Sequence, residues 1–308
     1  MLKTLFRDLR PSHKLLFTGF VVVIAFLFTQ IIATILAIPL FGLDQVMKML
    51  SGLDFSDPDS MNLLKYFQVF QSIGLFIVPP LIVAWFFHES ISVYLSLSRK
   101  PMLPAIILVV LLIFIINPFI NFTGAINAEM HFPEWMSGVE RWMRNAEDTA
   151  EKLTKAFLKV DTIGGLLLNL FMIAVLPALG EELLFRGVIQ KLFSQITRNL
   201  HWGIWISAAL FSALHMQFYG FIPRLLLGGM FGYLLVWSSS LWLPIIAHFI
   251  NNAAAVILLY MIDKGQIDPR IEEFGTGEWY VALFSLIMGL LILAAIRNQK
   301  KPISSTSG

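Results

Sequence analysis

The 308-residue chain contains no cysteine. This absence excludes disulfides, thiolate nucleophiles, cysteine-ligated metals and lipid anchors on cysteine. It also leaves the redox compartment of the protein undefined, because there are no thiols or disulfides from which to infer it. Any nucleophile, base or metal ligand must come from other side chains.

Charged residues are scarce, at 14% of the chain, whereas hydrophobic residues make up 57%. Soluble chains contain about 25% charged and about 45–50% apolar residues. The apolar residues are too many for one buried core, so several segments must face lipid. The net charge of +2 gives no indication of a nucleic-acid partner. The composition therefore predicts an integral, multi-pass protein of the lipid bilayer.

Long uncharged runs predict an all-α, polytopic bundle of about eight transmembrane helices, since a bilayer core of about 30 Å needs about 20 helical residues. We expect these helices near residues 15–41, 66–87, 102–120, 163–180, 202–217, 222–237, 241–262 and 279–296. The first run is too long for the apolar part of a signal peptide. The two helices within 202–237 are short and carry His215 and Arg224 at membrane depth. A hairpin that only half crosses the membrane is the alternative there.

Eight crossings place both termini on one side, and lysine and arginine are enriched on the cytoplasmic side. With an inside N-terminus, the inner segments contain Lys3, Arg7, Arg10, Lys14, Arg99, Lys100, Arg186, Lys191, Arg198, Arg297, Lys300 and Lys301. The short outer segments contain Lys48, Lys65, Arg224, Lys264 and Arg270, and the long segment 121–162 adds Arg141, Arg144, Lys152, Lys155 and Lys159, offset by seven acids from Glu129 to Asp161. This bias predicts that both termini are cytoplasmic.

The long segment 121–162 contains apolar residues at three- and four-residue spacing, with charges between them. They are Trp135, Met136, Val139, Trp142, Met143 and Ala146. The spacing is typical of an amphipathic helix on the membrane surface. A loop helix packed on neighbouring spans is an equal alternative. The polar end, 304–308, is expected to be disordered.

Ionisable groups inside apolar runs point to chemistry, because a charge at the bilayer centre costs at least about 2.5–3.5 kcal/mol on insertion scales. Glu181, Glu182 and Arg186 follow Pro177 in such a run. Glu182 and Arg186 are four residues apart with the acid first, the favourable order for a helical ion pair. Glu181 lies about 100° further around the helix. One carboxylate is thus neutralised and the other is free to act as a general base, although a salt-bridge cluster that anchors a helix end has the same pattern.

Two further apolar segments end in, or contain, histidine. Phe211 precedes His215 by four residues, and His248 precedes Asn252 by four, so each pair shares a helix face. His215 alone is more typical of a hydrogen-bonded packing residue, and His248 with Asn252 of interhelical hydrogen bonding. Three such clusters on three predicted spans make these separate explanations less attractive.

The ordered motifs Glu-Glu-x-x-x-Arg, Phe-x-x-x-His and His-x-x-x-Asn resemble those of the CPBP family of intramembrane proteases. This family includes the type II CAAX prenyl endopeptidases, or Ras-converting enzymes, and the Abi proteins. The resemblance covers roughly residues 163–258. It divides the chain into N-terminal transmembrane helices with an amphipathic extramembrane segment (1–160), a catalytic core (161–262), and a last transmembrane helix with a polar cytoplasmic tail (263–308).

The resemblance implies a glutamate-dependent peptidase. Glu181 and His215 would activate a water, and His248 and Asn252 would stabilise the oxyanion. Glu182 and Arg186 would order the site. A glutamate and two histidines are also a ligand set of hydrolytic zinc, so a zinc ion on Glu181, His215 and His248 is the alternative, although no His-Glu-x-x-His is present.

The resemblance implies membrane-bound or lipidated, CAAX-like peptides as substrates and the bacterial cytoplasmic membrane as the location. Nothing in the sequence identifies a prenyl site. Two readings without catalysis stay open, a membrane scaffold or bacteriocin-immunity protein and a transporter with buried relay residues. The chain shows no inverted repeat, which disfavours the transporter.

Overall fold

The computed structural model describes residues 3–51 and 57–299, and these residues form helices without any strand. Seven helical segments of this part of the chain are long and apolar enough to cross a membrane: Pro11–Phe41, Asp59–Phe87, Leu103–Ala128, Ile163–Thr197, Phe218–Ser238, Trp242–Asp263 and Trp279–Asn298. The remaining predicted crossing is an apolar helix of 15 residues, α11 (Leu200–Leu214). The all-α membrane bundle predicted from the sequence is confirmed. The predicted tail at 304–308 lies outside the described residues.

π-helical segments interrupt two of the spans. One span consists of α3 (Pro58–Ser72), η1 (Ile73–Ile77) and α4 (Val78–Phe87). The other consists of α8 (Ile163–Asn169), η3 (Leu170–Val175), α9 (Leu176–Glu181), η4 (Glu182–Ile189) and α10 (Gln190–Thr197). A proline lies two residues after the end of each of η1 and η3, Pro79 and Pro177, and a wider turn accommodates the missing N–H and the bulk of the ring.

The span that begins at Ile163 continues to Thr197, well beyond the predicted end at 180. Arg186 is therefore buried within a span, and its placement among the inner-loop charges was wrong. Its charge does not end the helix because ion pairing inside the bundle satisfies it. Hydropathy alone could not show this.

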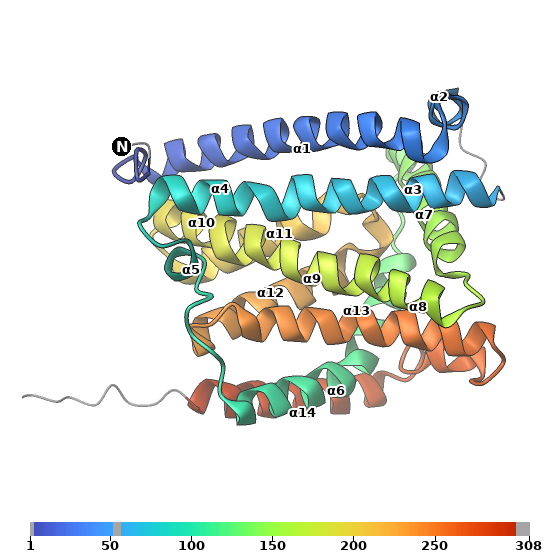
Figure 1. Cartoon of the computed structure of the whole chain (residues 1–308). Helices are drawn as coiled ribbons and strands as arrows, with labels where there is room; N and C mark the ends of the chain where they lie inside the picture. Colours follow the sequence, from blue (N-terminus) through green and yellow to red (C-terminus); the bar gives the residue numbers. More distant parts are fainter. Residues whose placement is uncertain (1–2, 52–56, 300–308) are drawn as a thin grey trace, which may run out of the picture.

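The other elements complete the chain: α1 (Pro11–Phe41), α2 (Leu43–Ser51), α5 (Ile91–Tyr94), α6 (Leu103–Ala128), η2 (Glu134–Met136), α7 (Ser137–Leu158), η5 (Phe218–Gly220), α12 (Phe221–Ser238), α13 (Trp242–Asp263), η6 (Pro269–Glu273) and α14 (Trp279–Asn298). The start of α1 and the end of α14 lie at one end of the bundle, which we call the terminal end (Figure 1). α2 and α7 lie at the other, the α7 end.

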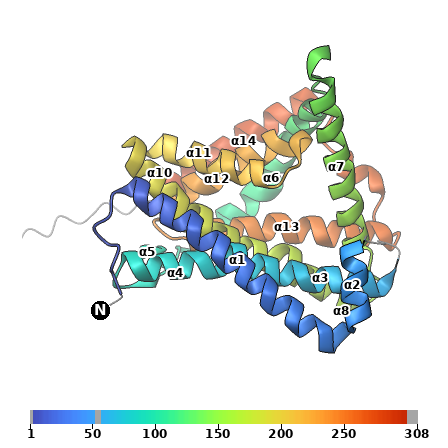
Figure 2. The same cartoon turned by 90° about the horizontal axis from the view of Figure 1, so that it is seen from above.

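α7 runs across the ends of the spans rather than parallel to them (Figure 2). It is held by Glu147, whose Oε2 accepts from the N–H of Tyr219 at 3.1 Å, and by Arg144, whose guanidinium lies 4.4 Å from the centre of the Tyr219 ring. At the other end of α7, Asn169 Nδ2 donates to the carbonyl of Phe157 at 2.9 Å. The predicted amphipathic helix thus packs on its neighbours.

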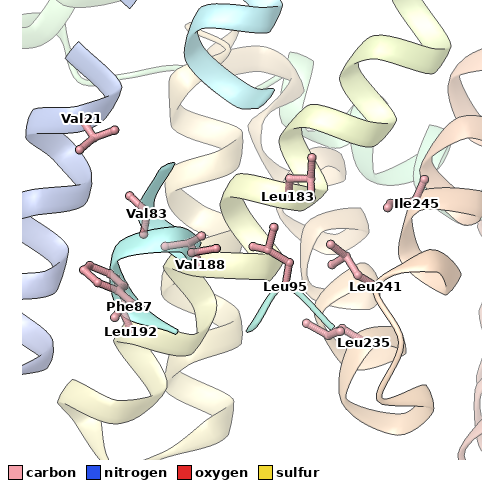
Figure 3. Close-up of a cluster of buried hydrophobic side chains, with 11 residues drawn as sticks. Val21, Val83, Phe87, Leu95, Leu183, Val188, Leu192, Leu235, Leu241 and Ile245 are labelled. Carbon is pink, nitrogen blue, oxygen red and sulfur yellow. The ribbon is translucent and has the colours of Figure 1, made fainter. Parts of the chain in front are cut away.

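A buried apolar cluster fixes the span that carries the acidic motif (Figure 3). Its members come from α1, α4, η4, α10, α12 and α13 and the loop between α5 and α6, and include Val21, Val83, Phe87, Leu95, Leu183, Val188, Leu192, Leu235, Leu241 and Ile245. Close packing rather than removal from water stabilises such contacts within a membrane. Leu183 and Val188 anchor η4 here, which sets the direction of its two charged residues.

Candidate functional site

A cavity of about 350 Å³ lies inside the bundle and reaches toward the α7 end. Glu181, His215, His248 and Asn252 all line it, from α9, the end of α11 and α13. Leu153, Thr154 and Phe157 of α7 line it as well. The structure thus brings the four residues predicted to be catalytic around one space, and α7 borders it.

Glu182 is the centre of a buried network that reaches the cavity through His248. Its Oε1 accepts from Arg186 Nη1 at 2.8 Å and from His248 Nδ1 at 2.9 Å. The side chains of Glu182 and Arg186 are 0% and 1% exposed. A buried pair of this kind offsets its desolvation only with further hydrogen bonds. His248 supplies one of these bonds and is oriented by it.

Arg186 is enclosed by α11 and α12. Its Nη2 donates to the carbonyl of Gly228 at 3.0 Å, and its guanidinium lies 4.6 Å from the ring centre of Phe211. Gly228 makes this approach possible, because a Cβ there would lie 3.3 Å from Nη2 and 3.0 Å from the Cβ of Ala208. Small residues are typical where membrane helices pack closely.

Glu181 has no such partner. Its Oε2 is buried without a hydrogen bond, and His248 Nε2 lies 3.8 Å away, which is too long for one. Glu182 Oε2 is also buried without a hydrogen bond, but Glu182 is held through Oε1 and does not line the cavity, whereas Glu181 lines it and forms no hydrogen bond with any described residue. The two adjacent glutamates therefore differ as the helical spacing indicated: Glu182 is neutralised and Glu181 is free.

Hydrogen bonds define the protonated nitrogen of each histidine ring. His215 Nδ1 lies 2.8 Å from the carbonyl oxygen of Phe211, and His248 Nδ1 faces the carboxylate of Glu182. Because both oxygens only accept, Nδ1 carries the proton in each ring and Nε2 of a neutral ring is the acceptor. The packing interpretation of His215 thus accounts for Nδ1 alone, and Nε2 remains available.

Asn252 forms a hydrogen bond within the protein, to a partner that was not predicted from the sequence. Pro177 lacks an N–H for the carbonyl of Ile173, four residues earlier, and Asn252 Nδ2 donates to that oxygen at 3.0 Å. Asn251 Nδ2 in turn donates to Asn252 Oδ1 at 3.1 Å. Interhelical hydrogen bonding therefore engages one of the two N–H groups of Asn252.

Four polar residues outside the motifs also line the cavity: Gln68, Thr154, Arg224 and Asn251. The available signal for Arg224 was its charge at membrane depth, which sequence reasoning used only to question the length of a span. Gln68 and Asn251 have no comparable signal, because an amide inside a predicted span is as typical of helix packing as of a site.

Within residues 3–51 and 57–299, no three His, Asp or Glu side chains are arranged to hold a metal ion. Glu181, His215 and His248, the candidate zinc ligands, share the cavity but do not form such a group. Their donor atoms suit proton transfer directly, because each histidine presents Nε2 and Glu181 an unpaired oxygen.

Comparison with known proteins agrees with the motifs. Residues 163–254 match the family described as "Type II CAAX prenyl endopeptidase Rce1-like". The chain is 32% identical over 111 residues to "Uncharacterized protein YpbD" of Bacillus subtilis (strain 168), covering 34% of this chain and 54% of that protein. The chain thus spans about half the length of the curated relative it matches. No solved structure matches the chain.

The apolar helices are those of an integral membrane protein. Residues 163–254, the segment that matches the Rce1-like family, contain all three motifs and the four cavity-lining residues Glu181, His215, His248 and Asn252.

Proposed function

We propose that the protein is an intramembrane endopeptidase that cleaves peptide bonds of membrane-associated substrates, with Glu181 as general base. The observation that carries this proposal is the unpaired carboxylate oxygen of Glu181 at a cavity that also holds two histidines with free Nε2 atoms. Glu182 also has an unpaired oxygen, but it is bonded to Arg186 and His248 and does not line the cavity, so Glu181 is the glutamate available to a substrate. The Rce1-like match supports the same class of reaction.

In the proposed reaction, Glu181 takes a proton from a water that His215 Nε2 orients. The water oxygen forms a bond to the scissile carbonyl carbon, and the carbonyl oxygen becomes an oxyanion. The second N–H of Asn252 donates to this oxyanion, and His248, which Glu182 orients through Nδ1, donates to it from Nε2 when that nitrogen carries a proton. The C–N bond then breaks, and protonated Glu181 returns its proton to the leaving nitrogen.

We propose membrane-bound or lipidated peptides as substrates, with the roles of Glu182 and Arg186 limited to ordering His248. The cavity lies among membrane-spanning helices, and apolar side chains such as Met172, Leu227 and Phe231 line it beside the polar residues. A soluble peptide would have to leave water to reach Glu181, whereas a segment already in the bilayer would not.

A cleavage assay tests the proposal. Purified protein in lipid nanodiscs is incubated with membrane-spanning and lipidated peptides, and products are identified by mass spectrometry. Glu181→Gln keeps the shape of the side chain but removes the proton acceptor, so turnover should fall by about 10²–10⁴-fold. Glu151→Gln, an exposed carboxylate paired with Lys155, is the matched control and should retain full activity. Equal activity of wild type and Glu181→Gln would exclude Glu181 as the base.

A further inference from the structure

Arg224 lies in the first turns of α12 and lines the same cavity as Glu181 and His215. It belongs to none of the three motifs, and the proposed reaction does not use it. Its Nη1 donates a hydrogen bond to the carbonyl of Gln217 at 3.2 Å. A guanidinium has five N–H donors, so most of its donor capacity is unused.

No acid neutralises Arg224 within ion-pair distance. Among the described residues, no carboxylate oxygen lies within 4.0 Å of its guanidinium nitrogens. Glu147 of α7 acts on it through its charge, but that carboxylate accepts from the N–H of Tyr219 at 3.1 Å. Arg186, the other arginine beside the cavity, has Glu182 as its partner at 2.8 Å. Among the described residues, Arg224 therefore has no direct ion-pair partner, and Glu147 acts on it only from a longer distance.

The surroundings of Arg224 leave room for its head group. Gly220 lies against it, and a Cβ at that position would come within 2.1 Å of Nη2. A charged residue inside a membrane bundle usually pairs with another charge or marks the path of a ligand. A guanidinium forms paired, parallel hydrogen bonds with carboxylates. A peptide substrate brings such a group at its C-terminus or on an acidic side chain.

We propose that Arg224 binds a carboxylate of the peptide substrate and thereby fixes which peptide bond reaches Glu181. This inference rests on the proposed peptidase function and adds a specificity residue to the same site. Arg224 takes no part in the proton transfers. Its loss should weaken the selection of acidic peptides and leave neutral ones unaffected.

Binding is measured without turnover, in the Glu181→Gln background, in nanodiscs of neutral phosphatidylcholine. The probes are fluorescein-labelled hexapeptides of alanine and leucine that end in a free carboxylate or in an amide. A second, amidated pair carries aspartate or asparagine in the chain. We expect a carboxylate to improve affinity about tenfold or more, the effect of a charge-assisted hydrogen bond. A gain in affinity in the first pair would identify the C-terminal carboxylate as the group bound, and a gain in the second pair would identify the aspartate side chain.

Arg224→Gln should abolish this gain and leave the affinity for the uncharged peptides unchanged. Arg224→Lys should retain part of it, and Gly220→Ala should reduce it by displacing the guanidinium while keeping the charge. Arg270→Gln, which alters an exposed arginine paired with Asp268, should behave as the parent. Equal binding of acid and neutral peptides, or failure of all peptides to bind, would overturn the proposal, as would a gain that survives Arg224→Gln.

A lipid phosphate is the competing ligand, and nanodiscs with phosphatidylglycerol test for it. If the protein without peptide retains this lipid through Arg224, and the peptides show no carboxylate preference, Arg224 is a lipid site and the proposal is wrong. Cleavage by the wild type without a carboxylate preference would refute the role of Arg224 and leave the peptidase intact. A carboxylate preference without cleavage would refute the peptidase alone.

Discussion

Glu181 and Glu182 are neighbours in sequence, but their surroundings give them opposite energetic roles. The Oε2 atoms of both residues are buried without a hydrogen bond, but Glu182 Oε1 has two donors at hydrogen-bond distance, whereas Glu181 lines the cavity. The spacing of four between Glu182 and Arg186 made their pair predictable from the sequence. The bond from His248 was not predictable, because it depends on the packing of α13 against η4.

We therefore predict opposite effects on stability at these positions. Arg186→Met leaves the Glu182 carboxylate buried without its main partner and should cost about 3–5 kcal/mol of unfolding free energy. Glu181→Gln removes an unsatisfied charge and should leave Tm unchanged or raise it. Thermal unfolding in detergent, followed by circular dichroism, measures both. A large loss of Tm in Glu181→Gln would mean that Glu181 has a structural partner.

The bond from Asn252 to the carbonyl of Ile173 allows its structural and catalytic roles to be separated. Asn252→Ala should lower stability by about 0.6 kcal/mol, the mean for hydrogen bonds between membrane helices. In a Pro177→Ala background, the N–H of residue 177 can donate to the Ile173 carbonyl. Asn252→Ala should then lower the unfolding free energy by less. The loss of turnover, about 10²–10³-fold for an oxyanion donor, should persist in both backgrounds. Turnover that recovers with stability would limit Asn252 to a structural role.

At the scale of elements, hydropathy and helical spacing predicted most of the fold, because both are local properties of the chain. The membrane spans and the amphipathic segment were found in this way. The π-helical turns were not, although Pro177 and Pro79 were signals for them. The end of the fourth span at Thr197 was also missed, because a charge that is satisfied inside the bundle resembles a helix end in the sequence.

α7 exposes an apolar stripe although it packs against η5. Trp135, in η2 just before it, is 81% exposed, and Val139 and Trp142 are 45% and 52% exposed. Glu140, next to Val139 in the sequence, forms an ion pair with Arg144 at 2.8 Å. The hydrogen bonds from Arg144, the Phe132 N–H and His131 lower the pKa of Glu140 to about 2, so this tie persists at neutral pH.

We predict that the stripe lies in the membrane interface, where tryptophan is enriched. The chain has no cysteine, so a spin label can be placed at Val139→Cys or, about 200° around the helix, at Arg141→Cys. The label at 139 should be relaxed by oxygen, which concentrates in lipid. The label at 141 should be relaxed by a water-soluble nickel complex. Relaxation of both labels by nickel would show that α7 is a loop helix in water.

For the whole molecule, the two ends of the bundle differ in charge. Described basic residues at the terminal end include Arg7, Arg10, Arg99, Lys100 and Arg297, and acids there are few. The α7 end carries most of the acids, among them Glu129, Glu134, Glu147, Asp148, Glu151, Asp263, Glu272 and Glu278. The cavity reaches toward this acidic end.

The α7 end also carries basic residues, among them Lys48, Arg141, Lys152, Lys155 and Arg270. The cytoplasmic N-terminus predicted from the sequence would place the terminal end in the cytoplasm, and with it a catalytic cavity that faces the opposite side of the membrane. Single cysteines at Asp8 and Ser98 (terminal end) and at Asp148 and Glu278 (α7 end) test this, because all four positions are exposed and non-basic. In intact cells that express the protein, a membrane-impermeant maleimide should label 148 and 278 at once. It should label 8 and 98 only after permeabilisation.

The reverse pattern would place the cavity on the cytoplasmic side, and labelling of one position from each end would contradict the arrangement of the spans. With the predicted pattern, only substrates whose cleavage site lies toward the outer half of the bilayer can reach Glu181, because α7 and the cavity lie on that side.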